Sequence, residues 1–317
     1  MTVLILARDL DADADNMITA LHERGMAVYR VNTAWFPARL RLSASLRGGR
    51  WSGQLCIPAH TVELEEIHAV WYRSPEAYRM PAELSPVERH HCLREAKYGL
   101  GGVLASLPVL WVNHPSRLAD AAYKPVQLVR AHEYGLSVPE TVITNEPESV
   151  RFFAAAGRTI TKLLGANTIS EEGCRKLSWT RMLGPDNLDD LRGFDVTSHL
   201  VQRWVPKSFE VRVVVIDDHL TAVKIKAGSP DSSIDWRSDY AALTYELIEP
   251  PGHVAHGIRA LMRSFGLMYG ALDFIVSPDG EWVFLEVNAG GQYGWLEAAT
   301  GVPLTGYLAD VLTKGKQ

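Results

Sequence analysis

Short apolar runs and amphipathic segments alternate along the chain. Residues 2–7 are almost wholly apolar, which predicts a strand buried on both faces. The helix predicted after it ends near Arg24, because Gly25 is a favourable residue just beyond a helix C-terminus. A strand followed directly by a helix predicts an α/β arrangement for the N-terminal part of the chain.

Turn signals define further strands in the first third. Residues 39–46 and 51–57 are strand-like and are joined by Arg-Gly-Gly-Arg at 47–50, so we expect a hairpin. Residues 69–73 predict another strand, and residues 109–113 a short one.

Two helix starts and one helix break are also visible. Ser-Pro-Val-Glu at 85–88 is a capping box with proline at the first helical position, which predicts a helix running toward Gly101. Ser116 can cap a second helix. Pro125 restricts the residue before it, so Lys124 is expected at a kink between that helix and the next.

The remaining two thirds continue the alternation without repeats. The predicted strands lie at 138–144, 158–164, 198–203, 210–217, 219–227, 269–276 and 282–288, the helices at 126–135 and 253–266, and a polar stretch at 165–175. This pattern predicts an α+β fold. Neither GxGxxG nor GxxxxGK[ST] occurs, so any nucleotide site must be built without the two common fingerprints.

Composition narrows the class of protein. The 317 residues are 47% hydrophobic and 22% charged, with a formal net charge of −5. At roughly 150 residues per domain, this length excludes a single small module. Mild acidity without clustered Lys and Arg excludes a dedicated nucleic-acid binder. No apolar run approaches the roughly 20 residues that span a bilayer, so we expect no membrane segment and a cytoplasmic location.

Two sets of residues that resemble metal ligands have simpler interpretations. Aspartates recur just before the first predicted helix, at Asp9, Asp11, Asp13 and Asp15. An EF-hand loop would need Gly and Glu where Ala14 and Ala20 stand, so we expect these aspartates to stabilise a helix N-terminus. His90, His91 and Cys92 are consecutive on a predicted helix and cannot converge on one ion.

The cysteines do not predict a disulfide framework or a metal site either. There are three, Cys56, Cys92 and Cys174, which are far apart and odd in number. We therefore expect neither a disulfide framework nor a CxxC metal site, and a reducing compartment.

The clearest chemical signal is a predicted hairpin near the C-terminal end, where two apolar strands flank a turn at 277–280. Because strand residues alternate between faces, Glu286 and Asn288 share one face. A two-residue loop would place Asp273 directly opposite Glu286. A three-residue loop with a bulge at Gly280 would reverse its face, and the sequence leaves this register open.

Oxygen ligands on one face suit Mg²⁺ that completes its shell with water and substrate phosphates. The alternative is an exposed polar sheet face.

Lys162 lies among apolar residues and needs an anion if it points inward, or only solvent if it points outward. Glu210 and Arg212 share a strand face, and a simple ion pair between them fits the pattern equally well.

Several motifs occur in the order typical of the ATP-grasp superfamily, and the resemblance covers nearly the whole chain. They are Val112-Asn-His-Pro115, Lys124, residues 135–141, Lys162, residues 202–212, Asp273 and residues 285–288. Within the superfamily the chain resembles the RimK-like branch and, more specifically, the graspetide (microviridin-type) ribosomal peptide maturases. The residues that carry this closer resemblance are 69–73, 207–212 and 235–237 (Asp-Trp-Arg).

The resemblance implies an ATP-grasp fold whose nucleotide cleft lies between two antiparallel sheets. It implies a pre-ATP-grasp α/β domain at 1–115, a central subdomain at 116–200 and a C-terminal subdomain with the metal site at 201–317. The implied cofactors are ATP and Mg²⁺.

The resemblance also implies roles for individual residues. The implied nucleotide-binding residues are Lys124 and Lys162 for the phosphates, the backbone of Gln202, Arg203, Trp204 and Val205 for adenine, and Glu210 for ribose. The implied metal ligands are Asp273, Glu286 and Asn288.

Four further residues would act on the substrates. Arg212 and Lys226 would neutralise the transferring phosphoryl group, although Lys226 stands where relatives often carry Arg or His. Asp235 and Arg237 would orient acidic side chains of the substrate, and the alternative for them is a loop ion pair.

The activity implied is ADP-forming ligation through an acyl phosphate. A maturase of this kind joins Asp or Glu side chains of a ribosomal precursor peptide to its Ser, Thr or Lys side chains, and the peptide carries a leader and an acidic, hydroxyl-rich core. The alternatives are a RimK-like ligase that adds an amino acid to a peptide or protein, and a non-catalytic ATP-binding module. A homodimer is left open.

Overall fold

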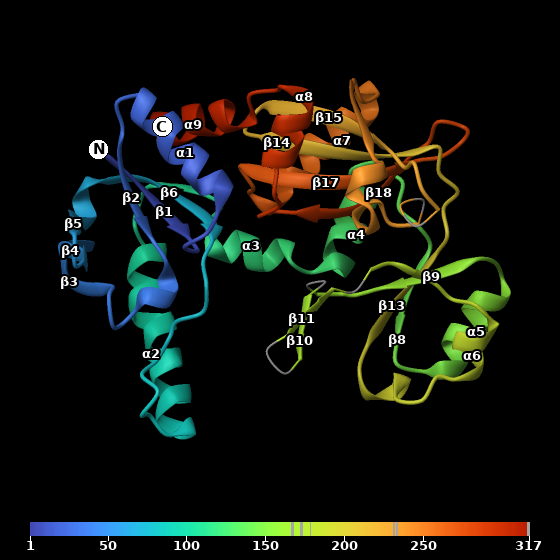
Figure 1. Ribbon diagram of the computed structural model, residues 1–317, viewed down its shortest axis with the longest axis horizontal. Coiled ribbons are helices and arrows are strands. Elements are labelled where there is room, and N and C mark those ends of the chain that lie inside the picture. Colours follow the sequence, from blue (N-terminus) through green and yellow to red (C-terminus); the bar gives the residue numbers. More distant parts are fainter. Residues whose placement is uncertain (166–167, 172–173, 178, 231, 233, 316–317) are drawn as a thin grey trace.

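The computed structural model describes residues 1–315 apart from 166–167, 172–173, 178, 231 and 233 (Figure 1). The N-terminal part is built on a four-stranded parallel sheet, and antiparallel sheets of four and five strands follow it. In Figure 1 the N-terminal part lies at the left, the C-terminal sheet at the upper right and the central sheet at the lower right. The predicted α+β fold with an α/β N-terminal part is confirmed.

The N-terminal sheet has the strand order β2-β1-β6-β7. These strands are β1 (Thr2–Ala7), β2 (Ala27–Val31), β6 (Ile67–Ser74) and β7 (Leu110–Val112). Both faces of β1 are covered, as its apolar run predicted: Val3 and Ile5 belong to the core that includes helix α1 (Ala12–Glu23), and Leu4 and Leu6 to the core that includes helix α2 (Pro86–Ala105).

Three of the four aspartates near the start of the chain lie at a helix N-terminus, as expected, whereas Asp9 precedes it and accepts a hydrogen bond from the Asn32 side chain at 3.1 Å. Asp11 is the N-cap of α1, where its Oδ1 accepts a hydrogen bond from the Ala14 N–H at 3.2 Å. Asp13 and Asp15 lie in the first turn of the helix, where a negative charge is favourable.

A small antiparallel sheet packs beside this region. It contains β3 (Arg41–Arg47), β4 (Arg50–Ile57) and β5 (His60–Glu63). Gly48 and Gly49 join β3 to β4 with φ of 55° and 76°, so the predicted hairpin turn requires two residues that tolerate positive φ.

Three helices follow from the predicted start and break signals. The capping box at Ser85 is present, and α2 continues four residues beyond Gly101 to Ala105. Helix α3 (Pro115–Ala121) is capped by His114, whose ring accepts from the Ser116 N–H at 3.2 Å, so the cap predicted at Ser116 was wrong. Helix α4 (Lys124–Glu133) begins at Lys124, the expected break point.

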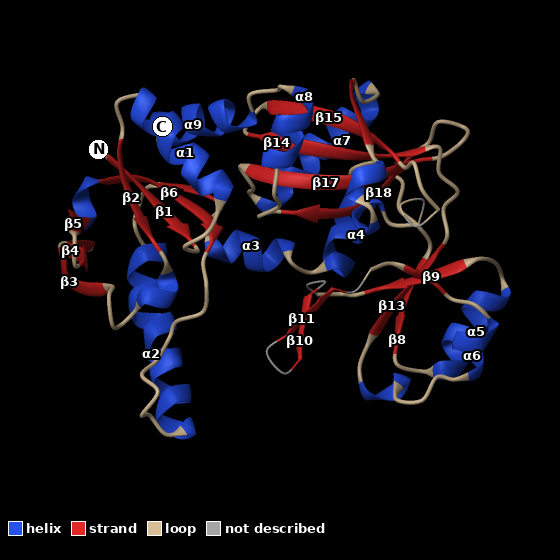
Figure 2. Ribbon diagram, in the orientation of Figure 1, coloured by secondary structure: helices blue, strands red, loops and turns tan. Residues whose placement is uncertain are grey.

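The central sheet has the order β12-β9-β13-β8. Its strands are β8 (Thr141–Thr144), β9 (Thr159–Lys162), β12 (Arg181–Met182) and β13 (His199–Arg203), accompanied by helices α5 (Pro147–Ala155) and α6 (Pro185–Asp189). Strands β10 (Thr168–Glu171) and β11 (Cys174–Leu177) form a separate hairpin (Figure 2). Strand β10 and the start of β11 fall in the polar stretch expected at 165–175, part of which lies outside the described residues.

The C-terminal sheet has the order β16-β15-β14-β17-β18. The strands are β14 (Phe209–Ile216), β15 (His219–Lys226), β16 (Thr244–Ile248), β17 (Tyr269–Val276) and β18 (Trp282–Asn288). Helix α7 (Gly252–Phe265) and α4 share one buried cluster with this sheet. Helices α8 (Gly294–Thr300) and α9 (Leu304–Lys314) lie in the cluster that also includes the N-terminal sheet, so one core joins the two ends of the chain.

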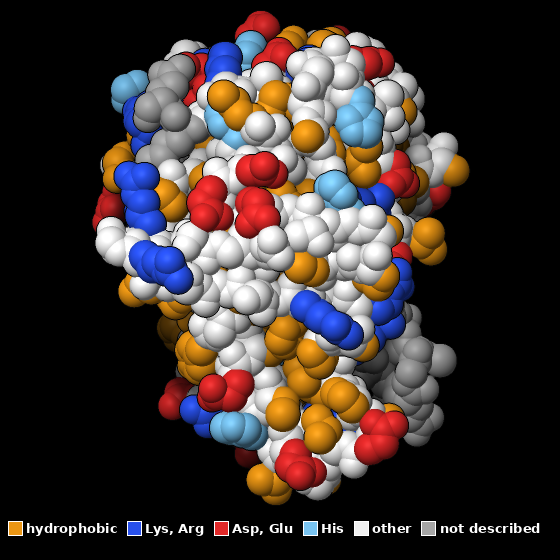
Figure 3. All heavy atoms as spheres, turned by 90° about the vertical axis from the view of Figure 1, so that its left-hand side faces the viewer, with side chains coloured by type: hydrophobic (Ala, Val, Ile, Leu, Met, Phe, Trp, Pro, Cys, Tyr) orange, Lys and Arg blue, Asp and Glu red, His pale blue; other side chains and the backbone are white. Residues whose placement is uncertain are grey.

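Short 3₁₀ helices complete the structure at Thr33–Trp35, Leu64–Glu66, Phe194–Val196, Trp236–Ser238 and Tyr240–Ala242. On the face of the N-terminal part seen in Figure 3, acidic and basic side chains are mixed, and hydrophobic side chains gather toward its lower end. No helix in the described part of the chain is long and apolar enough to cross a membrane.

Candidate active site

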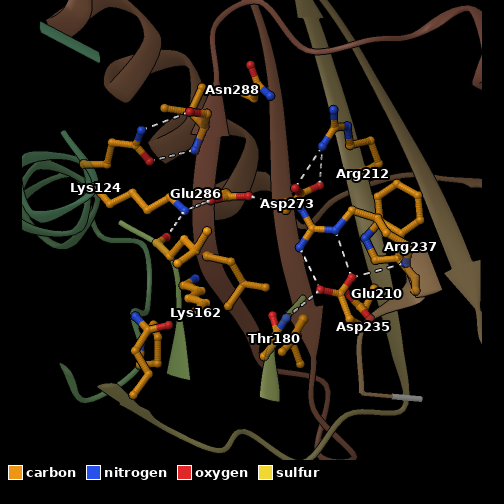
Figure 4. A pocket seen from close by; sticks show the side chains of 18 of the residues that line it. Lys124, Lys162, Thr180, Glu210, Arg212, Asp235, Arg237, Asp273, Glu286 and Asn288 are labelled. Atoms are coloured by element: carbon orange, nitrogen blue, oxygen red, sulfur yellow. Dashed lines mark hydrogen bonds and ion pairs between the residues drawn. The ribbon is translucent and has the colours of Figure 1, made fainter. Parts of the chain in front are cut away.

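A cavity of about 600 Å³ lies between the central and C-terminal sheets, with α4 also contributing to its lining. This volume is typical of sites that bind a small molecule of nucleotide size. It brings together nearly all of the site residues expected from the sequence (Figure 4). Those that line it are Lys124, Lys162, Gln202, Arg203, Trp204, Val205, Glu210, Arg212, Asp235, Arg237, Asp273, Glu286 and Asn288.

The β17–β18 hairpin resolves the register that the sequence left open. Next to the turn, Phe274 pairs with Phe284, which is the register of a three-residue loop, and Gly280 has the positive φ (88°) that such a loop uses. A second irregularity between Asp273 and Phe274 then shifts the pairing by one residue. Asp273 consequently lies directly opposite Glu286, and both face the cavity.

Arg212 and Asp273 form a buried ion pair at the floor of the site. They are direct partners across β14 and β17, and Arg212 Nη1 lies 2.8 Å from each carboxylate oxygen. Both residues are at most 6% exposed. In a pair this buried each charge compensates the other, and removal of either partner would leave an uncompensated charge in a medium of low polarity.

Glu286 is held as a carboxylate by the cations around it. Lys124 Nζ lies 3.0 Å from its Oε2, and Arg237 Nη1 lies 3.7 Å from its Oε1. Burial alone would raise the pKa of Glu286, but Lys162, Lys124 and Arg237 together hold it well below the ordinary value. The site therefore keeps a charged oxygen ligand at neutral pH.

Lys162 ends strand β9 on the opposite side of the cleft and points into it (Figure 4). The outward, solvent-facing alternative is therefore wrong. Its ammonium has no hydrogen bond or ion pair among the described residues, and burial lowers its pKa although Glu286 partly opposes this. A cation in this state gains most from an anionic ligand.

Glu210 pairs with Lys207 rather than with Arg212, so the simple Glu210–Arg212 ion pair was wrong. Lys207 also donates to the Ile234 carbonyl at 3.1 Å. Burial raises the pKa of Glu210 to about 7, and Lys207 limits that rise. With this pKa, the Glu210 carboxyl changes its charge near neutral pH.

The segment after β13 crosses from one sheet to the other along the cavity. The Arg203 and Trp204 N–H groups already donate to the Glu140 and Arg158 carbonyls, both at 2.9 Å. Predicted backbone contacts to adenine from these two residues are therefore limited to their carbonyls. Gln202 adds a side-chain acceptor, because its Oε1 is buried without a hydrogen-bond partner.

Asp235 and Arg237 form a two-point ion pair, with Nε–Oδ1 at 2.8 Å and Nη2–Oδ2 at 3.0 Å. Asp235 also accepts from the Thr180 N–H at 3.2 Å, which links the loop to the far side of the cleft. The ion pair holds the pKa of Asp235 below its usual value despite burial. The loop ion pair exists, and it lies within the cavity.

Lys226 is the one predicted site residue that the structure does not bring to the cavity. Ile225 pairs with Glu210 and shares its face, so the next residue, Lys226, projects to the other side of the sheet. It is exposed. The phosphoryl-neutralising role predicted for Lys226 is therefore wrong.

The sequence analysis missed a residue that holds strand β18 in place. Gln127 of α4 is 3% exposed, and its amide group donates to the Val287 carbonyl at 3.0 Å and accepts from the Val287 N–H at 2.9 Å. This contact fixes the backbone between Glu286 and Asn288. A polar residue on the buried side of an amphipathic helix was the available signal.

The donor set fits Mg²⁺ that binds together with a phosphate. Two carboxylates and one amide oxygen are available at Asp273, Glu286 and Asn288, all hard ligands. Among the described residues, no group of three or more His, Cys, Asp or Glu side chains is gathered for a metal. The protein alone supplies too few ligands, and phosphate oxygens would complete the shell.

Comparison with known proteins agrees with this geometry. Residues 2–119 match the family described as the MvdD pre-ATP grasp domain. The macrocyclase MdnC from Microcystis aeruginosa MRC, solved with the precursor peptide MdnA, is 27% identical with a TM-score of 0.87, over 99% of this chain and 100% of that chain. No curated protein sequence matches.

Two further solved structures extend the likeness. A Chryseobacterium gregarium RiPP-associated ATP-grasp ligase, solved with ADP and a leader and core peptide, is 28% identical with a TM-score of 0.88, over 99% and 96% of the two chains. The ATP-grasp ligase PsnB, solved with minimal precursor, Mg and ADP, is 26% identical with a TM-score of 0.77, over 99% and 96%. The chain has the ATP-grasp fold, and the predicted resemblance to peptide maturases of this fold is confirmed.

Proposed function

We propose that this ATP-grasp chain is an ADP-forming ligase that cross-links a ribosomal precursor peptide, joining Asp or Glu side chains to Ser or Thr hydroxyls or Lys amines. The observation that carries the proposal is the cleft itself. Two facing carboxylates, Asp273 and Glu286, lie within one network of Lys and Arg side chains. The likeness to peptide ligases over nearly the whole chain supports the peptide as substrate.

The nucleotide has a natural orientation in this cleft. Lys162 and Lys124 lie beside Glu286 and would bind phosphates, because an ammonium–phosphate hydrogen bond is stronger than one between neutral groups. Gln202 Oε1 and the segment through Val205 supply acceptors and a donor for adenine, and Glu210 would accept from a ribose hydroxyl.

Asp273, Glu286 and Asn288 would hold Mg²⁺ against the phosphates. When bound, the ion would reduce the negative charge that repels an incoming carboxylate. Arg212 lies against Asp273 and would contribute positive charge beside the transferring phosphoryl group.

The chemistry needs no nucleophilic side chain. A substrate carboxylate oxygen attacks the γ-phosphorus, the bond to the β-phosphate oxygen breaks, and ADP leaves. A substrate hydroxyl or amine then attacks the acyl carbon and phosphate departs, so one water is lost from the peptide overall. The protein holds the reactants in line and stabilises their charge.

Arg237 and Asp235 are placed to meet the peptide. Arg237 lies between Asp235 and Glu286, so an acidic side chain entering the cleft could accept from its guanidinium in place of one of them. A fork of donors matches a carboxylate geometrically. We propose this pair as the contact for the acidic core residues.

The same proposal assigns functions to the three units of the chain and describes its partner peptide. Residues 1–115, 116–200 and 201–317 would serve as the pre-ATP-grasp, central and metal-bearing units. The partner would be a peptide with a leader and an acidic, hydroxyl-rich core, and the cytoplasm supplies both ATP and a newly made ribosomal peptide. A homodimer is compatible with this scheme.

The test is the identity of the nucleotide product. With the precursor encoded beside the gene, ATP and Mg²⁺, we expect ADP and phosphate in proportion to the cross-links formed. AMP and pyrophosphate in that proportion would overturn the acyl-phosphate mechanism.

A further inference from the structure

The backbone that follows Asn288 is held by side chains from the N-terminal third of the chain. The carbonyls of Ala289, Gly290 and Gly291 each accept a hydrogen bond from a side chain rather than from a neighbouring strand. Because this loop directly follows a proposed metal ligand, its donors affect the geometry of the site.

Arg73, the last residue of the 69–73 motif, contacts two of these carbonyls. Its Nη1 lies 3.3 Å from Gly290 O and 3.5 Å from Gly291 O. Its Nη2 lies 2.6 Å from Asp13, and its Nε lies 3.4 Å from Asp11. With a side chain only 5% exposed, the guanidinium is fixed between α1 and the loop.

Asn113, from the 112–115 motif, holds the first carbonyl. Its Nδ2 donates to Ala289 O and to Tyr269 O, both at 2.8 Å, and its Oδ1 accepts from the Met268 and Tyr269 N–H groups. Its amide thus ties β17 to the start of the loop. The Tyr269 hydroxyl donates to Gly291 O at 2.5 Å.

The loop in turn supports the charged floor of the cavity. A Cβ on Gly291 would lie 2.7 Å from Arg212 Nη2 and 2.8 Å from the Ala271 Cβ, so the backbone at Gly291 passes directly behind the Arg212 guanidinium. On the other side, Asn288 Oδ1 accepts from the Gly290 N–H at 3.1 Å. A shift of the loop would move both Arg212 and Asn288.

We propose that Arg73 and Asn113 are positioning residues for phosphoryl transfer, through which the N-terminal part supports the active site from behind the cavity lining. This inference rests on the proposed function for its catalytic consequence. Asp13 orients Arg73, Arg73 fixes the glycine loop, and the loop fixes Arg212 and Asn288. Residues outside the first shell of a metal site commonly act in this way.

The test compares Arg73→Gln with Arg24→Gln. Arg24 is a matched control, because it also joins the N-terminal third to the C-terminal third through an aspartate, Asp310 at 2.7 Å, and a glycine carbonyl, Gly306 at 3.2 Å. It lies away from the cavity. Both variants remove one arginine that links the same two regions.

Arg73→Gln should raise the Mg²⁺ concentration for half-maximal turnover and lower kcat by ~10–100-fold, as is usual for such supporting residues. Its affinity for ATP in the presence of EDTA should stay within about two-fold of wild type, since the phosphate-binding lysines are untouched. Arg73→Lys, which keeps the charge, should recover part of the loss. Arg24→Gln should leave all three quantities unchanged.

Amide hydrogen exchange in the ligand-free protein gives a readout independent of activity. Residues 289–292 should exchange faster in Arg73→Gln and not in Arg24→Gln. If Arg73→Gln does not fold, Tyr269→Phe, which removes only the bond to Gly291 O, should show the same faster exchange to a smaller degree.

Two results would overturn the inference: unchanged exchange at 289–292 in Arg73→Gln and Tyr269→Phe, or a Mg²⁺ requirement shifted equally by Arg73→Gln and Arg24→Gln. A wild-type protein without peptide-dependent ATP turnover would instead overturn the proposed function. The exchange experiment would still decide whether Arg73 holds the loop.

Discussion

The two walls of the cleft are built differently. The C-terminal wall is a five-stranded sheet over a large buried core, and its charges are already paired, as Arg212 with Asp273 and Arg237 with Asp235. The central wall has four short strands over a small core of Val150, Phe153 and Val201. Its lysine, Lys162, has no ion-pair partner among the described residues.

This difference indicates that the two walls have different functions in the site. Arg212 and Asp273 are paired on the sheet, and Arg237 and Asp235 in the segment before β16. Charges paired in this way would keep the metal and phosphoryl geometry fixed before a ligand arrives, which lowers the cost of reorganisation during reaction. An unpaired, desolvated ammonium on a lightly packed wall gains its partner only from the nucleotide. The C-terminal wall should therefore control the chemical step, and the central wall nucleotide affinity.

The largest effect is expected on the C-terminal wall. Glu286→Gln removes one of two facing carboxylates at constant volume, so turnover should fall by ~100-fold or more while the protein stays folded. Glu246→Gln is the control, because this exposed glutamate pairs only with Lys224 on the far side of the sheet. ADP release assays and thermal melting would measure both, and full activity of Glu286→Gln would exclude the assigned metal site.

The central wall should show the opposite pattern. Lys162→Ala should weaken ATP binding by ~10-fold, the usual size of one charge-assisted contact of about 1.4 kcal/mol. It should lower Tm little, because the desolvation cost of the Lys162 ammonium offsets its attraction to the Glu286 carboxylate. Lys226→Ala is the matched control, and calorimetry giving equal ATP affinity for the two variants would return Lys162 to a structural role.

An effect on stability and not on activity is expected at the junction of the walls, where burial raises the pKa of Glu210 to about 7. In unfolded chains a Glu has a pKa near 4.3. Between pH 4.3 and 7, Glu210 is therefore protonated in more of the folded than of the unfolded molecules. The free energy of unfolding should therefore fall, by at most about 4 kcal/mol, as the pH rises from 4.3 to 7.

Glu210→Gln should remove that slope. Denaturant titrations of the ligand-free protein at several pH values would measure it, with Glu246→Gln as control. An identical slope in wild type and Glu210→Gln would show that the carboxyl titrates normally and does not sit in the environment described.

The two walls also differed in how far they could be predicted. The strands β14, β17 and β18 follow from long apolar runs within one residue, because packing on both faces requires such runs. On the central wall, β9 was placed, but the short strand β12 and helices α5 and α6 were not predicted, because a segment of so few residues leaves almost no periodic signal.

The identity of the site residues could be predicted from the sequence better than their arrangement in space. Asp273 and Glu286 face each other only because an irregularity in β18 corrects the register set at the turn, and no local pattern encodes that correction. The wrong prediction for Lys226 has a different cause. Glu210 faces the cavity and pairs with Ile225, so simple alternation along β15 turns Lys226 to the other face of the sheet. The roles of Arg73 and Gln127 depend on contacts with residues more than 150 positions away, which the sequence does not display.

The most direct test of the account is the intact mass of the precursor peptide. The purified protein would be incubated with the neighbouring precursor, ATP and Mg²⁺ and without free amino acids. We predict that the peptide loses one water for each ADP formed, and that Glu286→Gln prevents this loss. A peptide that gains mass, and does so only after a free amino acid is added, would contradict the cross-linking function and establish amino-acid addition instead.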